Sequence, residues 1–422
     1  MTRPASHGRS AALLATLDDF APYLDELRRT AAEHDVDRVH PFDEFRRFAV
    51  AGLGAVRVPV EFGGRGLGLV DFFDFLISLG AADSNIPQAL RQHYFRVELA
   101  LLQPSSPATT ELLHAIAAGR IFGNATSEAS NVPIGTIQTV LRTLPDGTLR
   151  LSGKKFYSTG NLYAQFIPVS AVDEHGDAVV VIVPADRQGV EISDDWPGFG
   201  QKLTASGTTT FTDVLVTDDE VLRRGTSDSH HTMGYHQLIL LATIAGIARA
   251  AADDVRRLVQ ERTRVYSAGS GDLPREDPLI QEAVGRAEAA AFTARAIVLS
   301  AAAVLQEAWD AWVDPDIDSA TSSALFAEAD IVVSTAQVSI VPLVLEQTSH
   351  IFDALGASAT HVRAALDRHW RNARTVGSHN PWIYKARQVG DYVLNEVLPP
   401  IFVAGSDVGV HPGAANSHSS KN

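Results

Sequence analysis

The most informative stretch of this sequence lies near the C-terminus and reads Trp370-Arg371-Asn372-Ala373-Arg374-Thr375-Val376-Gly377-Ser378-His379-Asn380-Pro381. It contains no carboxylate, and Gly377 and Pro381 predict a break in a helical segment that runs from about residue 360 to 395. A histidine in such a break can donate or accept a proton near neutral pH, because its ordinary pKa is about 6.5. Asn380 cannot act as a base, since an amide has no useful basicity. His379 is therefore the first candidate for acid–base chemistry.

Upstream of this break, the chain is predicted to be helical back to about residue 230. Three alanine-rich segments with helical apolar spacing are separated by Gly, Pro and Asp residues: Leu238–Arg264, Asp277–Trp312 and Ser319–Leu355. Residues from about 10 to 118 also keep three- and four-residue apolar spacing. The chain thus begins and ends with helices.

The section between these helical parts has the residue patterns of a β domain. Val179–Pro184 is an apolar, β-branched run, and Leu149–Gly153 follows the turn signal Pro145-Asp146-Gly147. Thr208–Thr212 and Val214–Val216 predict two more strands. We therefore expect an α+β protein divided into an N-terminal α domain (1–118), a middle β domain (119–225), a C-terminal α bundle (226–398) and a flexible tail (399–422).

Composition excludes several function classes. The chain has 422 residues, of which 45% are hydrophobic and 20% charged, as in a folded protein with a buried core. The absence of cysteine excludes disulfides, thiolate metal sites and thiol nucleophiles. A net charge of −15 disfavours nucleic acid and anionic membranes as partners. Neither a signal peptide nor an uninterrupted run of about 18 apolar residues is apparent, so a cytoplasmic location is expected.

Three further motifs, in this element order, resemble the acyl-CoA dehydrogenase superfamily along nearly the whole chain. Val58-Pro59-Val60-Glu61-Phe62-Gly63-Gly64 resembles its Pro-x-x-Tyr/Phe-Gly-Gly turn, and Asn124-Ala125-Thr126-Ser127-Glu128 and Ser152–Gly160 resemble segments that meet the flavin ring. The resemblance implies an acyl-CoA dehydrogenase-like α+β fold, with an N-terminal helical domain, a middle β-barrel-like domain and a C-terminal four-helix bundle. In the dehydrogenases, the quoted C-terminal stretch carries the catalytic glutamate, which this chain lacks.

Within the superfamily, the chain is more similar to flavin-dependent monooxygenases of the dibenzothiophene-monooxygenase kind and to sulfur-acquisition oxidoreductases. Five pieces carry this resemblance: Gln92–Phe95, Phe122–Ala125, Phe156–Gly160, Gly200–Thr208 and His369–Thr375. In that group the last piece continues His-x-Leu-His-Asp-Pro, whereas this chain reads Val376–Pro381. The second histidine is kept as His379 and the first is lost, a departure that bears on the substrate more than on the reaction.

The resemblance implies a two-component monooxygenase. Reduced flavin and O₂ would act through a flavin hydroperoxide on a small organosulfur or related heteroatom compound. FMN in its reduced form, FMNH₂, is the expected flavin, with FAD possible. No dinucleotide-binding motif is present, so a separate flavin reductase would supply the reduced flavin. The family also implies a homotetramer.

The candidate residues follow from the same motifs. His379 would donate a proton near the oxygen adduct, His93 would orient the substrate or share the proton, and the amide of Asn124 would hydrogen-bond to the flavin or adduct. The expected flavin-binding residues, for the ring and for the phosphate, are Asn124, Ser127, Tyr157, Thr159, Thr204, Ser206, Arg264 (toward a neighbouring subunit's flavin) and Lys385. A simpler interpretation, as structural hydrogen-bonding residues, is open for His93, His379, Asn124, Ser127 and Thr159.

Three rival functions stay open at this point. The first is an amine or amino-sugar N-hydroxylase on the same scaffold, and the second an acyl-CoA dehydrogenase with FAD and a relocated base. The third is a flavoprotein without activity that serves in assembly. Two clusters are interpreted outside the site. His230, His231 and His236 predict a surface loop rather than a metal site, because no His-Glu-x-x-His spacing accompanies them. A basic strip from Arg363 to Arg374 would meet a phosphate or form salt bridges.

Overall fold

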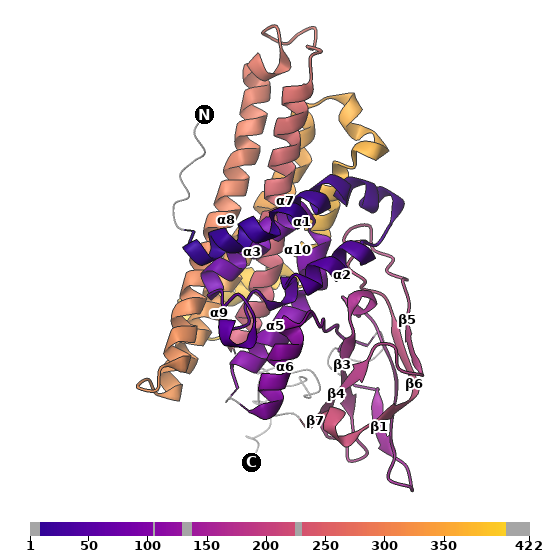
Figure 1. The fold of residues 1–422 in the computed structure, drawn as a ribbon. Helices are drawn as coiled ribbons and strands as arrows, with labels where there is room; N and C mark the ends of the chain where they lie inside the picture. The colour runs from indigo at the N-terminus through magenta and orange to yellow at the C-terminus, as the bar shows by residue number, and fades with distance from the viewer. Residues whose placement is uncertain (1–8, 104–105, 129–136, 224–229, 402–422) are drawn as a thin grey trace, which may run out of the picture.

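The computed structural model describes residues 9–103, 106–128, 137–223 and 230–401. Most of the predicted tail, from residue 402 onward, therefore lies outside the described residues. The described helices and strands follow the predicted order of helices, strands and helices (Figure 1). The α+β class and the acyl-CoA dehydrogenase-like arrangement are confirmed.

The N-terminal helices surround an aromatic core. They are α1 (Ala11–Asp37), α2 (Phe42–Val50), α3 (Leu69–Ala82), α4 (Asn85–Ala89), α5 (Arg91–Leu101) and α6 (Pro107–Ala117). In α3, ten of the fourteen residues are buried, since this helix lies between the other N-terminal helices and the C-terminal bundle. The ring of Phe72 stacks on that of Tyr235 from the bundle, with centroids 5.8 Å apart. The two helical parts therefore share one core.

Seven strands form one sheet in the described middle section. They are β1 (Val140–Thr143), β2 (Leu149–Lys155), β3 (Phe166–Val172), β4 (Ala178–Pro184), β5 (Val190–Ile192), β6 (Thr209–Val216) and β7 (Val221–Arg223), in the spatial order β5-β6-β2-β1-β3-β4-β7. Among the pairs of described strands, β1–β3 is parallel and the others are antiparallel. The two strands predicted at 208–212 and 214–216 are wrong in number, because they form the single strand β6.

The C-terminal part is built from long helices that run side by side (Figure 1). They are α7 (His230–Glu261), α8 (Pro278–Val313) and α9 (Ser319–His350), followed by α10 (Asp367–Gly377) and α11 (Trp382–Asn395). Alanine is frequent where these helices meet, so their backbones approach closely. The predicted break at Gly377–Pro381 is confirmed, because α10 ends at Gly377 and α11 starts at Trp382.

Two stretches of this bundle are apolar and long enough to cross a membrane by length and composition alone, Pro278–Val313 and Ser319–Ala354. Neither is an uninterrupted apolar run. In the structure α8 and α9 pack against each other and against α7. Core helices of a folded bundle meet the same two criteria, so the finding is weak evidence for a membrane.

The sheet is fastened to the helices by the loop before β6 and by the turn after β2. In the loop, the N–H of Gln201 donates to Asn372 Oδ1 on α10 (2.7 Å), and the N–H of Leu203 donates to Asn85 Oδ1 on α4 (3.2 Å). In the turn, Gly160 has φ +86°, and a Cβ there would overlap the carbonyl oxygen of Ala89. Glycine is therefore required at position 160 for both its backbone conformation and this close approach. These contacts bring the turn after β2 to the junction of α4 and α5.

Candidate functional site

Three hydroxyl groups form a connected cluster beside that junction. Thr159 Oγ1 lies 2.9 Å from Ser206 Oγ, which lies 2.7 Å from Thr204 Oγ1. Thr204 Oγ1 donates in turn to the carbonyl of Gln201 (2.9 Å). All three hydroxyl-bearing residues are buried. Sequence reasoning named them separately, and the structure brings them together.

The backbone around the hydroxyl cluster is strained. Tyr157, Gln201 and Ala205 are not glycine, yet their φ angles are 54°, 52° and 53°. Such left-handed conformations cost roughly 1–2 kcal/mol each for ordinary residues. Two buried polar atoms nearby, Ser158 Oγ and Gln201 Oε1, have no hydrogen-bond partner among the described residues. Strain and unpaired polar atoms concentrated at one place are typical of a binding site.

Two of the predicted ring contacts lie at the open side of this region. The side chain of Tyr157 is 59% exposed and meets the ring of Trp196 edge to face, with centroids 5.9 Å apart. Ser127 is also exposed, and its carbonyl accepts the N–H of Phe156 (2.8 Å). An exposed aromatic ring next to buried hydroxyls can cover a planar ligand.

Asn124 is buried and held by its neighbours. Its N–H donates to Asn161 Oδ1 (2.6 Å), and its own Oδ1 accepts the hydroxyl of Thr126 (2.9 Å). Within the described ranges, no acceptor is found for its side-chain NH₂ group. The oxygen of the amide is therefore used by the protein, and the NH₂ group is the part that can donate to a ligand.

His379 lies against an arginine that the sequence analysis did not single out. An Nη of Arg91 is 2.9 Å from His379 Nε2. A guanidinium can only donate, so Nε2 must accept and the ring proton must be on Nδ1. The positive charge of Arg91, together with burial, lowers the pKa of His379 to about 3. The charge of Arg91 is the main cause of the lowered pKa, because the side chain of His379 is exposed to solvent and burial contributes less. His379 is thus neutral near pH 7, with Nδ1–H as its donor.

A second neutral histidine lies close by on α7. His236 packs on the ring of Phe95, with centroids 3.7 Å apart, and its Nε2 is 3.2 Å from Gln92 Oε1. Burial, and then the nearby Arg91 and His379, lower its pKa well below the ordinary value. The surface loop predicted for the 230–236 histidines is wrong. They lie in the first turns of α7, and His231 is fully buried and hydrogen-bonded to Glu98 (2.9 Å).

His93 has no ring nitrogen free for a substrate. Its Nε2 donates to the carbonyl of Gly54 (2.9 Å), and its Nδ1 accepts the N–H of Phe122 (3.2 Å). The residue is fully buried, and burial lowers its pKa to about 4. The expectation that His93 orients a substrate or shares a proton is therefore corrected: both nitrogens hold the backbone that leads to Asn124.

Asn380 fixes the position of its neighbour His379. Its side-chain NH₂ donates to Gln237 Oε1 (2.7 Å), and its carbonyl accepts from Gln337 (3.1 Å). These contacts tie the break between α10 and α11 to α7 and α9. The helical bundle therefore positions His379 from two sides.

Two cations, Arg264 and Lys385, are predicted to bind the flavin phosphate. Within the described residues, neither contacts the hydroxyl cluster. Arg264 is exposed and follows the end of α7, about 38 Å along the helix axis from His236. Lys385 is half-buried on α11, and no ion pair joins it to another described residue. Arg264 can therefore meet a flavin at this site only if it comes from another copy of the chain.

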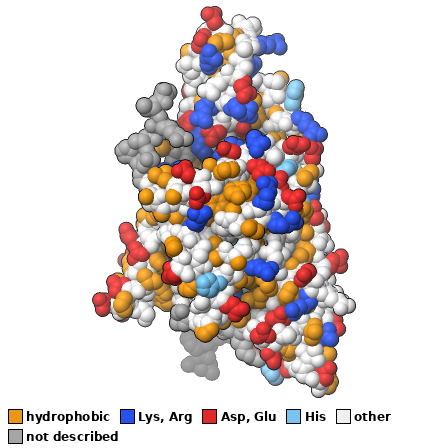
Figure 2. Space-filling model, in the orientation of Figure 1, with side chains coloured by type: hydrophobic (Ala, Val, Ile, Leu, Met, Phe, Trp, Pro, Cys, Tyr) orange, Lys and Arg blue, Asp and Glu red, His pale blue; other side chains and the backbone are white. Residues whose placement is uncertain are grey.

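The basic strip near the C-terminus is mostly paired with acids. Arg363 meets Asp37 (2.6 Å) and Arg368 meets Asp254 (2.7 Å), while Arg371 meets Asp35 and Asp367. The salt-bridge interpretation holds for these three arginines. On the face drawn in Figure 2, blue and red side chains are likewise interspersed. Among the described residues, no group of three or more His, Asp or Glu side chains has the arrangement of a metal site.

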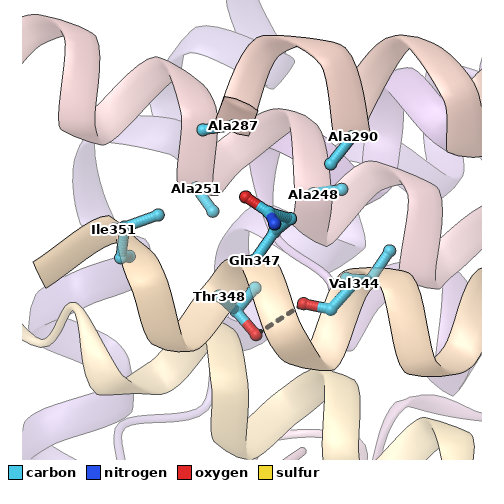
Figure 3. A pocket seen from close by; sticks show the side chains of 8 residues that line it. All are labelled: Ala248, Ala251, Ala287, Ala290, Val344, Gln347, Thr348 and Ile351. Carbon is cyan, nitrogen blue, oxygen red and sulfur yellow. Dashed lines mark hydrogen bonds between the residues drawn. The ribbon is translucent and has the colours of Figure 1, made fainter. Parts of the chain in front are cut away.

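A small cavity elsewhere contains none of the candidate residues. It lies between α7, α8 and α9 and is lined mainly by alanine methyl groups, with Gln347 and Thr348 as its polar side chains (Figure 3). It has room for about one water molecule. It is a packing gap in the bundle and does not compete with the region around His379.

Known proteins resemble this chain along most of its length. The acyl-CoA dehydrogenase C-terminal domain family matches residues 238–382. The chain is 29% identical over 385 residues to a dibenzothiophene monooxygenase of Mycolicibacterium goodii, covering 88% of this chain and 91% of that protein. It is 28% identical over 381 residues to the probable FMNH₂-dependent monooxygenase SfnC of Pseudomonas putida, covering 89% and 93%.

A solved structure extends the match to the whole fold. The methanesulfinate monooxygenase MsuC of Pseudomonas fluorescens superposes with a TM-score of 0.80 at 29% identity, covering 92% of this chain and 98% of that one. Family, relatives and structure thus agree with the resemblance that the sequence motifs carry. The chain is therefore similar in its C-terminal part to the acyl-CoA dehydrogenase C-terminal domain family, and along most of its length to monooxygenases that include an FMNH₂-dependent one.

Proposed function

We propose that the protein is a two-component monooxygenase that uses FMNH₂ and O₂ to oxidise a small organosulfur or related heteroatom compound. The observation that carries the proposal is the pairing of a neutral His379 with Arg91, two residues after the Ala89 carbonyl that Gly160 approaches. No carboxylate of the described chain lies against either side chain, so the place where a dehydrogenase needs its base holds a proton donor instead. That arrangement suits oxygen transfer better than removal of a carbon-bound proton.

The residues around the hydroxyl cluster fit a flavin. The unpaired Ser158 Oγ and Gln201 Oε1 offer hydrogen bonds to a polar ring edge, and the exposed ring of Tyr157 offers a planar surface. Thr159, Thr204 and Ser206 would hold the flavin, together with Asn124 and Ser127. Thr208 is not available in the same way, because Asp195 accepts both its N–H and its hydroxyl at 2.7 Å. When bound, FMNH₂ supplies the two electrons that activate O₂.

The protein's own side chains then have separate tasks. His379 Nδ1–H donates a hydrogen bond at the reacting oxygen, and Arg91 keeps Nε2 as the acceptor. The side-chain NH₂ of Asn124 donates from the opposite domain.

Three accompanying features belong to the same proposal. A separate reductase supplies FMNH₂, because no dinucleotide-binding motif is apparent in the sequence. The functional form is a homotetramer in which Arg264 of one copy, with Lys385, meets the phosphate of a neighbour's flavin. The exposed apolar side chains of α8 and α11, among them Phe292 (74% exposed) and Leu394 (81%), suit such contacts. The location is cytoplasmic.

The test is incorporation of ¹⁸O from ¹⁸O₂ into candidate sulfides, sulfinates and amines, with FMN, NADH and an added flavin reductase. Product should carry one labelled oxygen, and His379→Ala should lower turnover by roughly 10²–10⁴-fold. Ser378→Ala, which alters the exposed neighbour, should leave turnover unchanged.

Two outcomes would sink the proposal. Stoichiometric FAD that is bleached by an acyl-CoA would identify a dehydrogenase. Unchanged turnover in His379→Ala would remove the residue on which the argument rests. Labelled products from amines but not from sulfur compounds would assign the N-hydroxylase alternative.

A further inference from the structure

Arg91 is a buried charge without a counter-charge. It is the first residue of α5 and is 6% exposed, and its one described partner is the neutral His379. Its Nε is buried and has no partner among the described residues. Burial lowers the pKa of Arg91 to about 10, so the guanidinium is still charged near neutral pH.

Several other buried charges in the described chain are paired, whereas the buried carboxylate of Asp83 is held by Asn85 without an opposite charge. Lys155 Nζ lies 2.6 Å from Glu128, the carboxylate of Asp74 meets two arginines, and Arg57 lies 3.1 Å from Glu98. An unpaired buried ion costs several kcal/mol, so proteins rarely keep one without a use. At Arg91, the missing partner is an anion that the described chain does not provide.

The surroundings of Arg91 fit such an anion. His379 presents Nδ1–H as a donor, and His236 is held neutral by burial. Three residues before Arg91, Gln88 is buried and its Oε1 also has no described partner. These three side chains are uncharged, and His379 can donate a hydrogen bond to an anion bound by Arg91.

We propose that Arg91 binds a single oxyanion, a carboxylate or sulfinate, on the substrate, which places the substrate's sulfur beside His379. The inference rests on the proposed monooxygenase function and narrows it to small organic anions. Neutral thiophenes and sulfides then lack the group that Arg91 requires. A guanidinium suits this task because its fork of donors can bind two oxygens of one anion.

The reaction balances for an anionic substrate. One atom of O₂ forms a bond to the sulfur, which is oxidised by two electrons, and the other atom leaves as water. FMNH₂ provides two electrons and two protons and returns as FMN. The charge on the substrate is unchanged for a sulfinate that becomes a sulfonate, so Arg91 can hold substrate and product alike.

The experiment measures binding to the full-length protein without flavin, by isothermal titration calorimetry. The probes are benzenesulfinate and benzoate as anions, with methyl phenyl sulfoxide as the neutral counterpart of similar shape. The wild type should prefer the anions, and Arg91→Gln should bind them about 10–100-fold more weakly without a change for the sulfoxide. Arg91→Lys should fall between the two. Comparing the two anions tells whether a sulfinate or a carboxylate is preferred.

Arg96→Gln is the matched control. Arg96 is a half-buried arginine on the same helix, its Nε is also unpaired, and no described contact joins it to His379. This variant should bind all three probes as the wild type does. If Arg91→Gln does not fold, the ratio of anion to sulfoxide affinity in Arg91→Lys gives the same information.

Other outcomes overturn the inference or separate it from the proposed function. Equal affinity for anions and sulfoxide in the wild type would refute the anion site. If Arg91→Gln weakens binding of FMN but not of riboflavin, Arg91 holds the flavin phosphate and the inference fails. Preferential binding of anions without any oxygenated product would support the site while contradicting the monooxygenase.

Discussion

The two ends of α5 differ in how their buried charged residues are paired. Toward the C-terminal end, Glu98 is 1% exposed and accepts from Arg57 (3.1 Å) and from His231 (2.9 Å). At the N-terminal end, Arg91 is almost as deeply buried and meets no carboxylate of the described chain. One helix thus carries a completed ionic cluster and an incomplete one.

The difference separates charges that hold the fold from a charge that binds. Arg57 also donates to the carbonyl of Leu67 (3.0 Å) and lies 5.0 Å from the ring centre of Trp309, so the paired end joins α5, α7, α8 and the loop before α3. Burial alone would raise the pKa of Glu98, but Arg57 and His231 outweigh it and hold that pKa below the ordinary value. A cluster with its partners in place contributes to stability in the absence of any ligand.

The largest expected effect on stability comes from removing the charge of Glu98, which pairs with Arg57 toward the C-terminal end of α5. Glu98→Gln should lower the free energy of unfolding by about 3–5 kcal/mol, because it leaves Arg57 buried without its counter-charge. Urea unfolding checks this value. Glu282→Gln, in the exposed pair with Arg286, should change stability by at most about 0.5 kcal/mol. A small loss of stability in Glu98→Gln would mean that the two ends of α5 do not differ in their contribution to the free energy of unfolding.

The same pair predicts acid sensitivity. The folded-state pKa of Glu98 is lower than its unfolded value, so its contribution is present above about pH 4.5 and is lost as pH falls through the folded value. Unfolding of wild type and Glu98→Gln between pH 7 and 3 should therefore show the two stabilities converging toward the acid side. Parallel curves would contradict the assigned pKa direction.

The next prediction concerns Gly160, which holds the turn after β2 against Ala89, near the N-terminal end of α5. Gly160→Ala should destabilise the protein by about 1–3 kcal/mol and weaken FMN binding, because a Cβ at φ +86° would push the turn away from Ala89. Gly147 has a similar φ of +84° but open space around it, so Gly147→Ala should show only the conformational cost and normal FMN affinity. Thermal unfolding and flavin titration distinguish the two. Equal effects on FMN binding would show that the contact with Ala89 is not important.

A spectroscopic prediction concerns His379 itself. In the wild type, the charge of Arg91 holds the His379 pKa at about 3, so stability should fall as pH drops below about 6.5, where the unfolded chain takes up the proton more readily. Arg91→Gln should raise the His379 pKa by about one unit or more, as read from imidazole ¹⁵N shifts. Arg96→Gln provides the comparison. No rise in Arg91→Gln would mean that the pair is not formed in solution.

The smallest loss of stability is expected where an unpaired charge is removed. Arg91→Gln should leave the free energy of unfolding unchanged or raise it by up to a few kcal/mol, since it deletes an uncompensated buried ion rather than half of a pair. Denaturant titration without ligand checks this. A loss comparable to that in Glu98→Gln would show that Arg91 is structural and would weaken the case for an anion.

Much of this arrangement follows from local sequence signals. Apolar periodicity predicts the helices on both sides of the sheet, and Gly377 and Pro381 predict the break that presents His379. The weaker predictions concern strands, since β6 reads as two runs separated by the exposed Asp213. Short strands depend on their pairing partners more than on their own residues.

The site itself is only partly readable in the sequence. Thr159, Thr204 and Ser206 are visible as hydroxyls in motifs, but their mutual contacts arise from a loop fastened to α4 and α10. Arg91 carries no local signal, because one arginine in a helix is usually a solvated residue and only tertiary burial makes it unusual. His93 is the opposite case: its motif predicts a functional histidine, but both of its ring nitrogens are hydrogen-bonded to backbone groups.

The length of α7 has a consequence for genetics as well as for structure. It carries His236 at the site and ends at Glu261, about 38 Å farther along its axis and three residues before Arg264, so the two ends of one helix cannot serve one flavin. Under the proposed assembly, a chain damaged at residue 379 still lends an intact Arg264 to its neighbour. Two individually inactive proteins, His379→Ala and Arg264→Ala, would then recover activity when expressed together, because some mixed assemblies contain one fully equipped centre.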